Sequence, residues 1–227
     1  MKIAEIFYSV QGEGILLGVP SVFIRASGCN LRCAWCDTPY ASWVPEGEDW
    51  PTERILEEVR RHPARHVVIT GGEPMIMPDV VELTEALARA RLHLTIETAG
   101  TVFKPVRCDL MSISPKLSNS TPHERDGGRW VEQHERLRIQ PLVLRRLMSD
   151  YDYQLKFVVT APEDLAEIRG LVRELGADPA RVLLMPEGTD GETLRRRAEW
   201  IIEICKQEGF RYTPRLQIEI WGARRGV

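Results

Sequence analysis

The stretch Ser21–Thr38, SVFIRASGCNLRCAWCDT, joins an apolar segment to a dense group of cysteines. Its first part, Ser21–Ser27, contains Val, Phe and Ile, which favours a buried β-strand. Cys29, Cys33 and Cys36 then fall within eight residues, and no fourth cysteine lies nearby. The stretch therefore predicts a strand that carries three thiols at its carboxyl end.

Similar apolar runs alternate with helical patterns along the rest of the chain. The predicted strands are Lys2–Phe7, Ser21–Ser27, His66–Thr70, His93–Thr98, Met111–Ser114, Gln154–Val159, Arg181–Met185 and Arg215–Trp221. The predicted helices start at Thr52, expected to act as a cap, at Pro78, at Pro141, at Pro162 and at Thr189 or Asp190. The last two helices are expected to end at Gly176 and Gly209.

This alternation predicts parallel strands joined by right-handed crossovers. The repeats number nearer six than eight, so the expected fold class is α/β, with an open, partial parallel barrel of about six strands. A flat doubly wound sheet is the alternative. We expect a single domain over residues 1–227, with 1–20 as an N-terminal extension and 117–140 as a polar, irregular excursion.

Unusual residues follow five of the predicted strands. They are Cys29–Cys36, TGGEP at Thr70–Pro74, ETAG at Glu97–Gly100, SPK at Ser114–Lys116 and MPEG at Met185–Gly188. In a parallel barrel the carboxyl ends of the strands share one rim, where active sites form. We therefore expect these distant segments to face one cavity.

Composition limits the possible classes of function. The formal net charge of -3 gives no global positive field for nucleic acid or anionic lipid. The N-terminus does not read as a signal peptide, and no apolar run is long enough to span a membrane. We therefore expect a cytoplasmic protein, without a direct nucleic-acid or membrane partner, whose thiols stay reduced.

The three cysteines fit two kinds of metal site. A structural zinc site takes four protein ligands, and neither Cys108 nor Cys205 has a suitable spacing to the triplet. A cubane iron–sulfur cluster takes one thiolate per iron, so three thiolates leave one iron open. A molecule with an amine and a carboxylate could chelate that iron. A zinc-binding module without catalytic activity stays an alternative.

The spacing C-x3-C-x-Φ-C, with Trp35 as the aromatic residue, resembles the signature of the radical S-adenosylmethionine (SAM) superfamily. The resemblance implies a 4Fe-4S cluster held by Cys29, Cys33 and Cys36. It implies that SAM chelates the open iron and is split by an electron from the cluster, giving a 5′-deoxyadenosyl radical.

GGEP at Gly71–Pro74 is similar to the glycine-rich motif of this superfamily, which binds the methionyl amino group. Glycines such as Gly72 let the backbone approach a ligand closely, and Glu73 is an acceptor suited to an ammonium. The other SAM-contacting residues that the resemblance implies are Trp35, Asp37, Ser114, Pro115, Lys116 and Glu187.

The whole chain resembles the 7-carboxy-7-deazaguanine synthase family. The matching stretches are FYSVQGEG, SVFIRASGCNLRC, CDT, VVITGGEP, IETAG, SISPKLSNS, YDYQLKFVV, LLMPEG and WGARRGV. This resemblance implies a ring contraction of 6-carboxy-5,6,7,8-tetrahydropterin to 7-carboxy-7-deazaguanine with loss of ammonia, for queuosine and other 7-deazapurines. The deoxyadenosyl radical would take a hydrogen from C6 of the pterin and later return it.

The family resemblance also implies Mg²⁺, with the hydroxyl of Thr38 as a hard oxygen ligand. Thr38 taken alone reads as a turn residue. The substrate-binding residues that the family resemblance implies are Val10, Gln11, Gly12, Glu13, Arg25, Thr70 and Gln217. The family usually carries a histidine where this chain has Gln217, and an asparagine where it has Ala223.

Arg25 stands in an otherwise apolar strand and needs an anionic partner. The carboxylate of the substrate suits a bidentate contact with its guanidinium. A salt bridge to Glu13 or Glu97 is the alternative. Glu97 itself suits either a ligand contact or a buried structural acceptor.

A second class of radical enzyme shares the cysteine motif and GGEP. It comprises the activases that make a glycyl radical in a partner protein, and it is the alternative function for this chain. For the synthase, the expected partners are the small pterin substrate, an electron donor such as a flavodoxin or ferredoxin, and a second copy of the chain in a homodimer.

Overall fold

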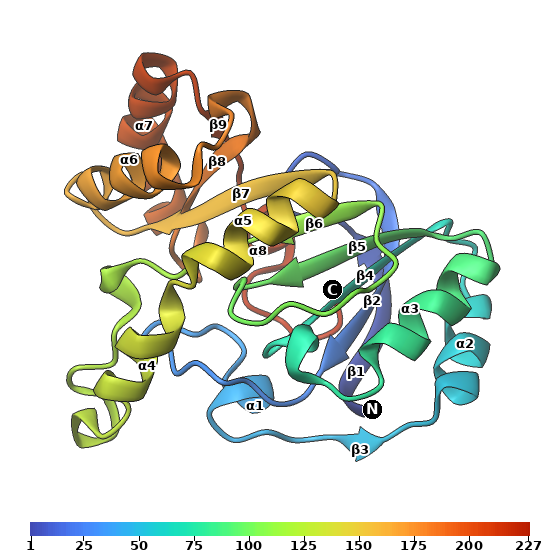
Figure 1. The fold of residues 1–227 in the computed structure, drawn as a ribbon. Coiled ribbons are helices and arrows are strands. Elements are labelled where there is room, and N and C mark those ends of the chain that lie inside the picture. Colours follow the sequence, from blue (N-terminus) through green and yellow to red (C-terminus); the bar gives the residue numbers. More distant parts are fainter.

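The computed structural model describes residues 1–227 and is built on an open sheet (Figure 1). The strands are β1 (Lys2–Val10), β2 (Pro20–Ala26), β3 (Glu48–Asp49), β4 (His66–Gly71), β5 (His93–Thr98), β6 (Leu110–Ile113), β7 (Tyr153–Val159), β8 (Val182–Pro186) and β9 (Arg211–Tyr212). Their order is β3-β1-β2-β4-β5-β6-β7-β8-β9, so the sheet does not close. From β2 onward all neighbours are parallel, whereas β1 is antiparallel to β2 and β3. The expected open, largely parallel α/β architecture is confirmed.

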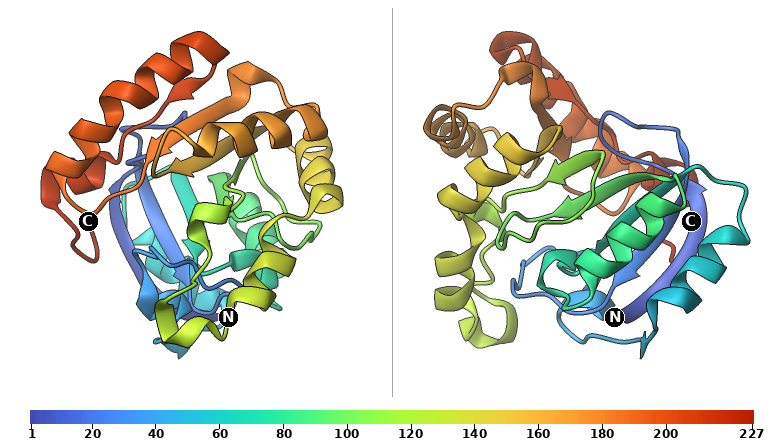
Figure 2. Two further views of the ribbon diagram at one scale, coloured as in Figure 1. Left: turned by 90° about the vertical axis from the view of Figure 1, so that its left-hand side faces the viewer. Right: turned by 45° about the vertical axis from the view of Figure 1, so that its right-hand side comes forward.

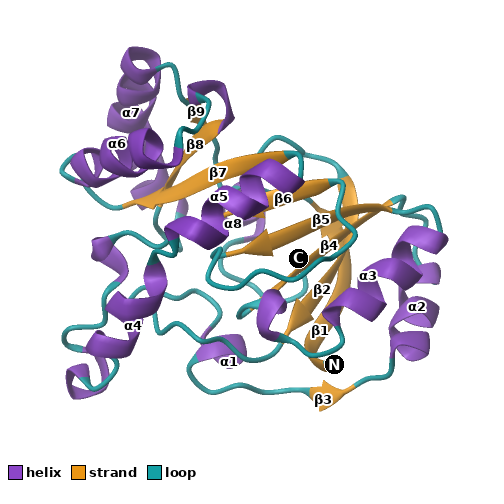
Figure 3. Ribbon diagram, viewed as in Figure 1, coloured by secondary structure: helices purple, strands orange, loops and turns teal.

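The helices flank this sheet (Figure 3). They are α1 (Pro39–Ser42), α2 (Thr52–Arg60), α3 (Val80–Arg89), α4 (Val131–Arg138), α5 (Pro141–Asp150), α6 (Asp164–Leu175), α7 (Gly191–Glu208) and α8 (Leu216–Trp221). Apolar residues of α2, α3, α5, α6 and α7 form one core cluster with residues of the strands. None of the helices combines the length and apolar character that a membrane span requires.

Alternation along the strands separates the two faces of the sheet. Each long parallel strand contributes an aliphatic residue to the core shared with the helices: Ile24, Ile69, Ile96, Ile113, Leu155 and Leu184. The next residue in each case lines a cavity on the other face: Arg25, Thr70, Glu97, Ser114, Lys156 and Met185. The register of the sheet therefore places these side chains, most of them polar, around one cavity.

One of the predicted strands is wrong. Arg215–Trp221 was expected to be a strand, but Leu216–Trp221 is helix α8. The short strand beside β8 is β9, which sequence analysis missed along with β3. The N–H of Thr213 still donates to the carbonyl of Leu184, but Pro214 has no N–H with which to continue such pairing.

Local signals predicted most helix ends correctly. Asp190 caps α7 by accepting a hydrogen bond from the N–H of Thr193, and Gly176 and Gly209 end α6 and α7 in the left-handed conformation. Thr52 is not the expected cap, because it already lies inside α2 and Pro51 holds the cap position.

The segment 117–140 was expected to be irregular, but it contains helix α4. Short 3₁₀ turns, Ser118–Ser120 and Arg125–Gly128, precede this helix. The segment lies at one corner of the molecule, beside the loop that leads into α1 (Figures 1 and 2).

Candidate active site

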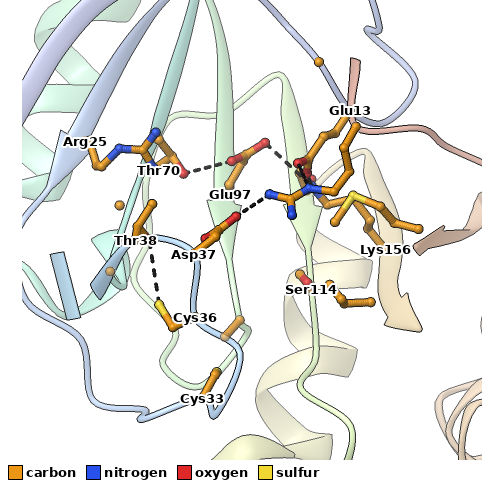
Figure 4. A pocket seen from close by; sticks show the side chains of 18 of the residues that line it. Glu13, Arg25, Cys33, Cys36, Asp37, Thr38, Thr70, Glu97, Ser114 and Lys156 are labelled. Carbon is orange, nitrogen blue, oxygen red and sulfur yellow. Dashed lines mark hydrogen bonds and ion pairs between the residues drawn. The ribbon is translucent and has the colours of Figure 1, made fainter. Parts of the chain in front are cut away.

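One large cavity, lined by 31 residues, lies where the parallel strands end (Figure 4). All five segments that follow predicted strands contribute to it, from the cysteines after β2 to Met185 near the end of β8 and Glu187 just after it. Cys33 and Cys36 lie at one end, whereas Arg25, Thr70 and Glu13 lie at the other. The cavity therefore has a thiol-rich part and a part rich in charged and polar groups.

The three cysteines of the triplet are free thiols, and all of them line the cavity. Burial raises the pKa of Cys33 to about 12 and that of Cys29 further still. Buried thiolates therefore need a cationic partner here. No three His, Cys, Asp or Glu side chains converge closely enough to hold a single ion. The donor set fits a cluster better than zinc, because each thiolate of a cubane binds a different iron.

Glu13 is the centre of a buried ion network. Its carboxylate pairs with Lys156, lies 3.3 Å from Nε of Arg215 and accepts a hydrogen bond of 2.8 Å from Nε2 of Gln217. Burial by itself would raise the pKa of Glu13, but the charges of Lys156 and Arg215 lower it to about 2. The carboxylate is therefore ionised and offers a fixed negative charge to the cavity.

Arg215 connects the polar part to the cysteine part. Its guanidinium pairs with Asp37, next to the last cysteine, and donates a hydrogen bond of 2.7 Å to the carbonyl of Gly188. Neither Arg215 nor Lys156, which both line the cavity, was predicted from the sequence as a site residue. Lys156 could have been found by the signal that identified Arg25, because each is a lone charge in an apolar strand.

Glu97 lies between these groups and the substrate-side residues proposed from the sequence. Its carboxylate accepts hydrogen bonds from the hydroxyl of Thr70 at 2.8 Å and from Nε2 of Gln11 at 3.3 Å. Nζ of Lys156 is 3.8 Å away. Glu97 is thus held by side chains from three other segments while it still lines the cavity.

Arg25 pairs with neither Glu13 nor Glu97, the two partners considered from the sequence. Its Nε lies 2.7 Å from the carboxylate of Glu5, which faces it in the antiparallel β1–β2 pair. Arg25 nevertheless lines the cavity, beside the stacked rings of Phe7 and Phe23, whose centroids are 5.0 Å apart.

The structure gathers most of the predicted site residues. The lining includes Val10, Gln11, Gly12, Glu13, Arg25, Cys29, Cys33, Trp35, Cys36, Asp37, Thr38, Thr70, Gly72, Ser114, Lys116, Glu187 and Gln217. Gln217 belongs to α8 and not to a strand, and its Oε1 is buried without a hydrogen-bond partner. Glu187 pairs with Arg197 of α7.

Glu73 and Pro115 do not line the cavity. Glu73 is fully buried, and its carboxylate accepts hydrogen bonds from the hydroxyl of Thr98 at 2.7 Å and from the N–H groups of Ala99 at 2.8 Å and Met75 at 3.0 Å. These internal donors occupy the acceptor that was expected to meet an ammonium. Glu73 therefore connects the ends of β4 and β5.

Comparison with known proteins agrees with this arrangement. The family model described as the Radical SAM superfamily matches residues 23–121. The 7-carboxy-7-deazaguanine synthase of Halobacterium salinarum is 44% identical, over 97% of this chain and 90% of the relative. The enzyme of the same name from Rhodopirellula baltica is 46% identical, over 100% of this chain and 89% of the relative.

Solved structures show the same fold. The crystal structure of QueE from Escherichia coli superposes with a TM-score of 0.70 at 29% identity, covering 95% of this chain and 93% of that one. SuiB from Streptococcus suis, at 18% identity and a TM-score of 0.56, covers 85% of this chain and 47% of its own. This second likeness concerns the fold alone.

Proposed function

We propose the function of this cavity from one premise, which is that the chain belongs to the 7-carboxy-7-deazaguanine synthase family and is a radical SAM enzyme. The proposed reaction is the ring contraction of 6-carboxy-5,6,7,8-tetrahydropterin to 7-carboxy-7-deazaguanine with release of ammonia. One observation supports this reaction most directly. The three-cysteine loop and a group of charged side chains line the same cavity, in a chain that matches the synthases over almost its whole length. The glycyl-radical activase is not favoured.

Family membership implies a 4Fe-4S cluster and SAM. Cys29, Cys33 and Cys36 would hold the cluster, which together with SAM supplies the one-electron chemistry that removes a hydrogen atom from the substrate. The residues proposed to hold SAM line the cavity around the cysteines: Trp35, Asp37, Gly72, Ser114, Lys116 and Glu187. The backbone of Gly72 is proposed for this contact, and the enclosed carboxylate of Glu73 is not.

The polar part of the cavity suits a pterin. The ionised carboxylate of Glu13 is an acceptor for the N–H groups along one edge of the ring, and Gln217, which lines the cavity and donates to Glu13, is proposed to lie at the same edge. Arg25 offers a guanidinium for the carboxylate of the substrate. Phe7 and Phe23 form an apolar wall beside Arg25 that limits access of water.

The protein contributes mainly by positioning. A radical reaction needs the reacting carbon held close to the hydrogen-abstracting group and shielded from solvent. Thr70 and Gln11 hold Glu97 at the cavity wall, and Lys156 holds Glu13. These contacts fix the polar side chains before the substrate enters, so binding requires little reorganisation.

We also propose Mg²⁺ as a cofactor, with the hydroxyl of Thr38 as one ligand. Thr38 lines the cavity, with its Oγ1 3.8 Å from Sγ of Cys36, and Mg²⁺ prefers oxygen ligands. The family resemblance further supports a homodimer, a flavodoxin or ferredoxin as electron donor, a cytoplasmic location, where thiols stay reduced, and a product that enters queuosine synthesis.

Anaerobic reconstitution with iron and sulfide, followed by incubation with 6-carboxytetrahydropterin, SAM and a reductant, tests the function. We expect 7-carboxy-7-deazaguanine and ammonia, detected by mass spectrometry and an ammonia assay, and more product with Mg²⁺ than without it. The Cys33→Ala variant should contain little iron and form no product. Iron-loaded wild-type protein that consumes no pterin would contradict the proposal.

A further inference from the structure

The loop that carries the three cysteines, residues 29–36, has no helix or strand of its own. Its backbone groups must therefore find partners elsewhere, because unpaired buried N–H and C=O groups are costly. Many of those partners come from residues 117–138, which end in α4 and which the proposed reaction does not use. We call these residues the clasp segment. It packs beside the cysteine loop (Figures 1 and 2).

Four contacts from the clasp segment hold the cysteine loop in addition to the one described below. Two of them involve the backbone of Ala34: its N–H donates to the carbonyl of Ser120 at 2.8 Å, and its carbonyl accepts from Nη1 of Arg125 at 3.0 Å. Nε2 of Gln133 donates to the carbonyl of Asn30 at 3.1 Å. Nε1 of Trp35 donates to the carbonyl of Asn119 at 3.1 Å. The loop is thus held on both sides of Cys33.

His134 lies at the centre of this contact and is 1% exposed. Its Nδ1 accepts a hydrogen bond of 3.2 Å from the N–H of Arg32, the residue before Cys33. Its Nε2 lies 2.9 Å from Oγ of Ser120, and that hydroxyl lies 2.6 Å from the carbonyl of Leu117.

These contacts determine the protonation state of the ring. Nδ1 of His134 must present its lone pair to the N–H of Arg32, so Nε2 carries the proton and donates to Ser120. The hydroxyl of Ser120 then donates to the carbonyl of Leu117. Every proton in this chain of bonds has one acceptor, and burial, which lowers the pKa of His134 to about 4, keeps the ring neutral.

We propose that His134 is a positioning residue for the iron–sulfur cluster. Its imidazole connects the backbone of the cysteine loop to the clasp segment and so holds the three thiols toward the cavity. This inference rests on one part of the proposed function, which is that the cysteine loop holds an iron–sulfur cluster. Partners that orient metal ligands without touching the metal commonly change metal affinity 10- to 100-fold when they are removed.

The test compares wild-type protein with His134→Phe and His134→Asn after anaerobic reconstitution. Phenylalanine keeps the shape of the ring and removes both hydrogen bonds, whereas asparagine keeps an acceptor for the N–H of Arg32. The readouts are iron and sulfide per chain, the rate at which a chelator removes iron, and the electron paramagnetic resonance spectrum of the reduced cluster. We expect iron loss about 10-fold faster and an altered spectrum for His134→Phe, with substantial recovery in His134→Asn.

The matched control is His123→Phe, since His123 is an exposed histidine of the same segment and should give wild-type iron loss. Wild-type iron loss and spectrum in His134→Phe would overturn the inference. If that variant does not fold, Ser120→Ala decides, because it removes the bond that orients the ring, together with the bond from the same hydroxyl to the carbonyl of Leu117, and leaves the imidazole and Arg32 in place. Faster iron loss then supports the inference, and unchanged loss overturns it.

None of these readouts depends on turnover of the pterin. Iron-loaded wild-type protein that forms no 7-carboxy-7-deazaguanine would refute the proposed function and leave the role of His134 standing. Unchanged iron loss in the variants would refute the role of His134 and leave the proposed function standing.

Discussion

At the scale of single residues, Arg25, the residue proposed to bind the substrate carboxylate, already has an anionic partner in the protein. Its pair with Glu5 is largely buried, and Glu5 also accepts a hydrogen bond of 2.8 Å from the hydroxyl of Tyr40. Arg25 therefore does not face the cavity as an uncompensated charge, which would be costly. A substrate carboxylate can share the remaining donors of the guanidinium.

We predict that Arg25→Ala keeps its iron but binds the pterin more weakly. Loss of a charge-assisted hydrogen bond, worth about 1.5–3 kcal/mol, should raise KM by roughly 10- to 100-fold. Steady-state kinetics together with an iron assay check this. Glu5→Gln is the control, because it leaves the guanidinium in place and should change KM far less. An unchanged KM in Arg25→Ala would show that the arginine only stabilises the β1–β2 pair.

At the scale of elements, the turn after β4 packs on the start of the cysteine loop. The N–H groups of Gly72 and Glu73 donate to the carbonyls of Ala26 at 3.1 Å and Gly28 at 2.9 Å. A Cβ added at Gly72 would lie 2.2 Å from the carbonyl oxygen of Gly28 and 2.5 Å from that of Ala41. The glycine is thus required for contact between two protein segments, in addition to any approach to a ligand.

Gly72→Ala should therefore lower the free energy of unfolding by about 1–3 kcal/mol, since backbone atoms must move to make room. Urea unfolding of the metal-free protein measures this effect. Gly170→Ala in α6 is the matched control, because a Cβ there meets no atom within 4 Å. That substitution should stabilise the protein by about 0.5–1 kcal/mol, as alanine is favoured over glycine inside helices. Equal effects of the two substitutions would contradict the packing argument.

At the scale of the whole molecule, the ion network joins segments that are far apart in the sequence. Glu13 follows β1, Lys156 belongs to β7 and Arg215 precedes α8, and all three side chains meet in the cavity. Asp37 adds the end of the cysteine loop. The network therefore ties segments near the two ends of the chain to the cavity, and the lowered pKa of Glu13 shows that its charged form is favoured in the folded protein.

Stability should fall in acid because of Glu13. Its pKa is lowered from the ordinary 4.5 to about 2, so its contribution is complete above about pH 4.5 and is lost as the pH falls toward 2. The loss should amount to about 3 kcal/mol at most. Urea unfolding of the metal-free protein between pH 2 and 7 should show a shallower pH dependence for Glu13→Gln than for wild type. The exposed Glu203→Gln is the control, and an identical slope in Glu13→Gln would contradict the expectation.

Several features could be predicted from neighbouring residues alone. The alternation of strands and helices, the cap at Asp190 and the left-handed glycines that end α6 and α7 depend on local periodicity and backbone preference. The three-cysteine spacing likewise indicated the part of the cavity proposed to hold the iron–sulfur cluster. Strand Arg215–Trp221 was predicted wrongly because its apolar residues alternate as in a strand, whereas pairing beside β8 stops at Pro214, which has no N–H, and the chain turns into α8.

The partners of the buried charges could not be predicted in the same way. Arg25 faces Glu5 only because of the antiparallel register of β1 and β2, and His134 reaches Arg32 only because α4 folds back onto the cysteine loop. The sequence by itself determined the fold class, the cluster-binding motif and the family, since these depend on local pattern and spacing. The tertiary structure alone decided which buried charges pair and that the clasp segment holds the cysteine loop, because those contacts depend on the placement of segments distant in the chain.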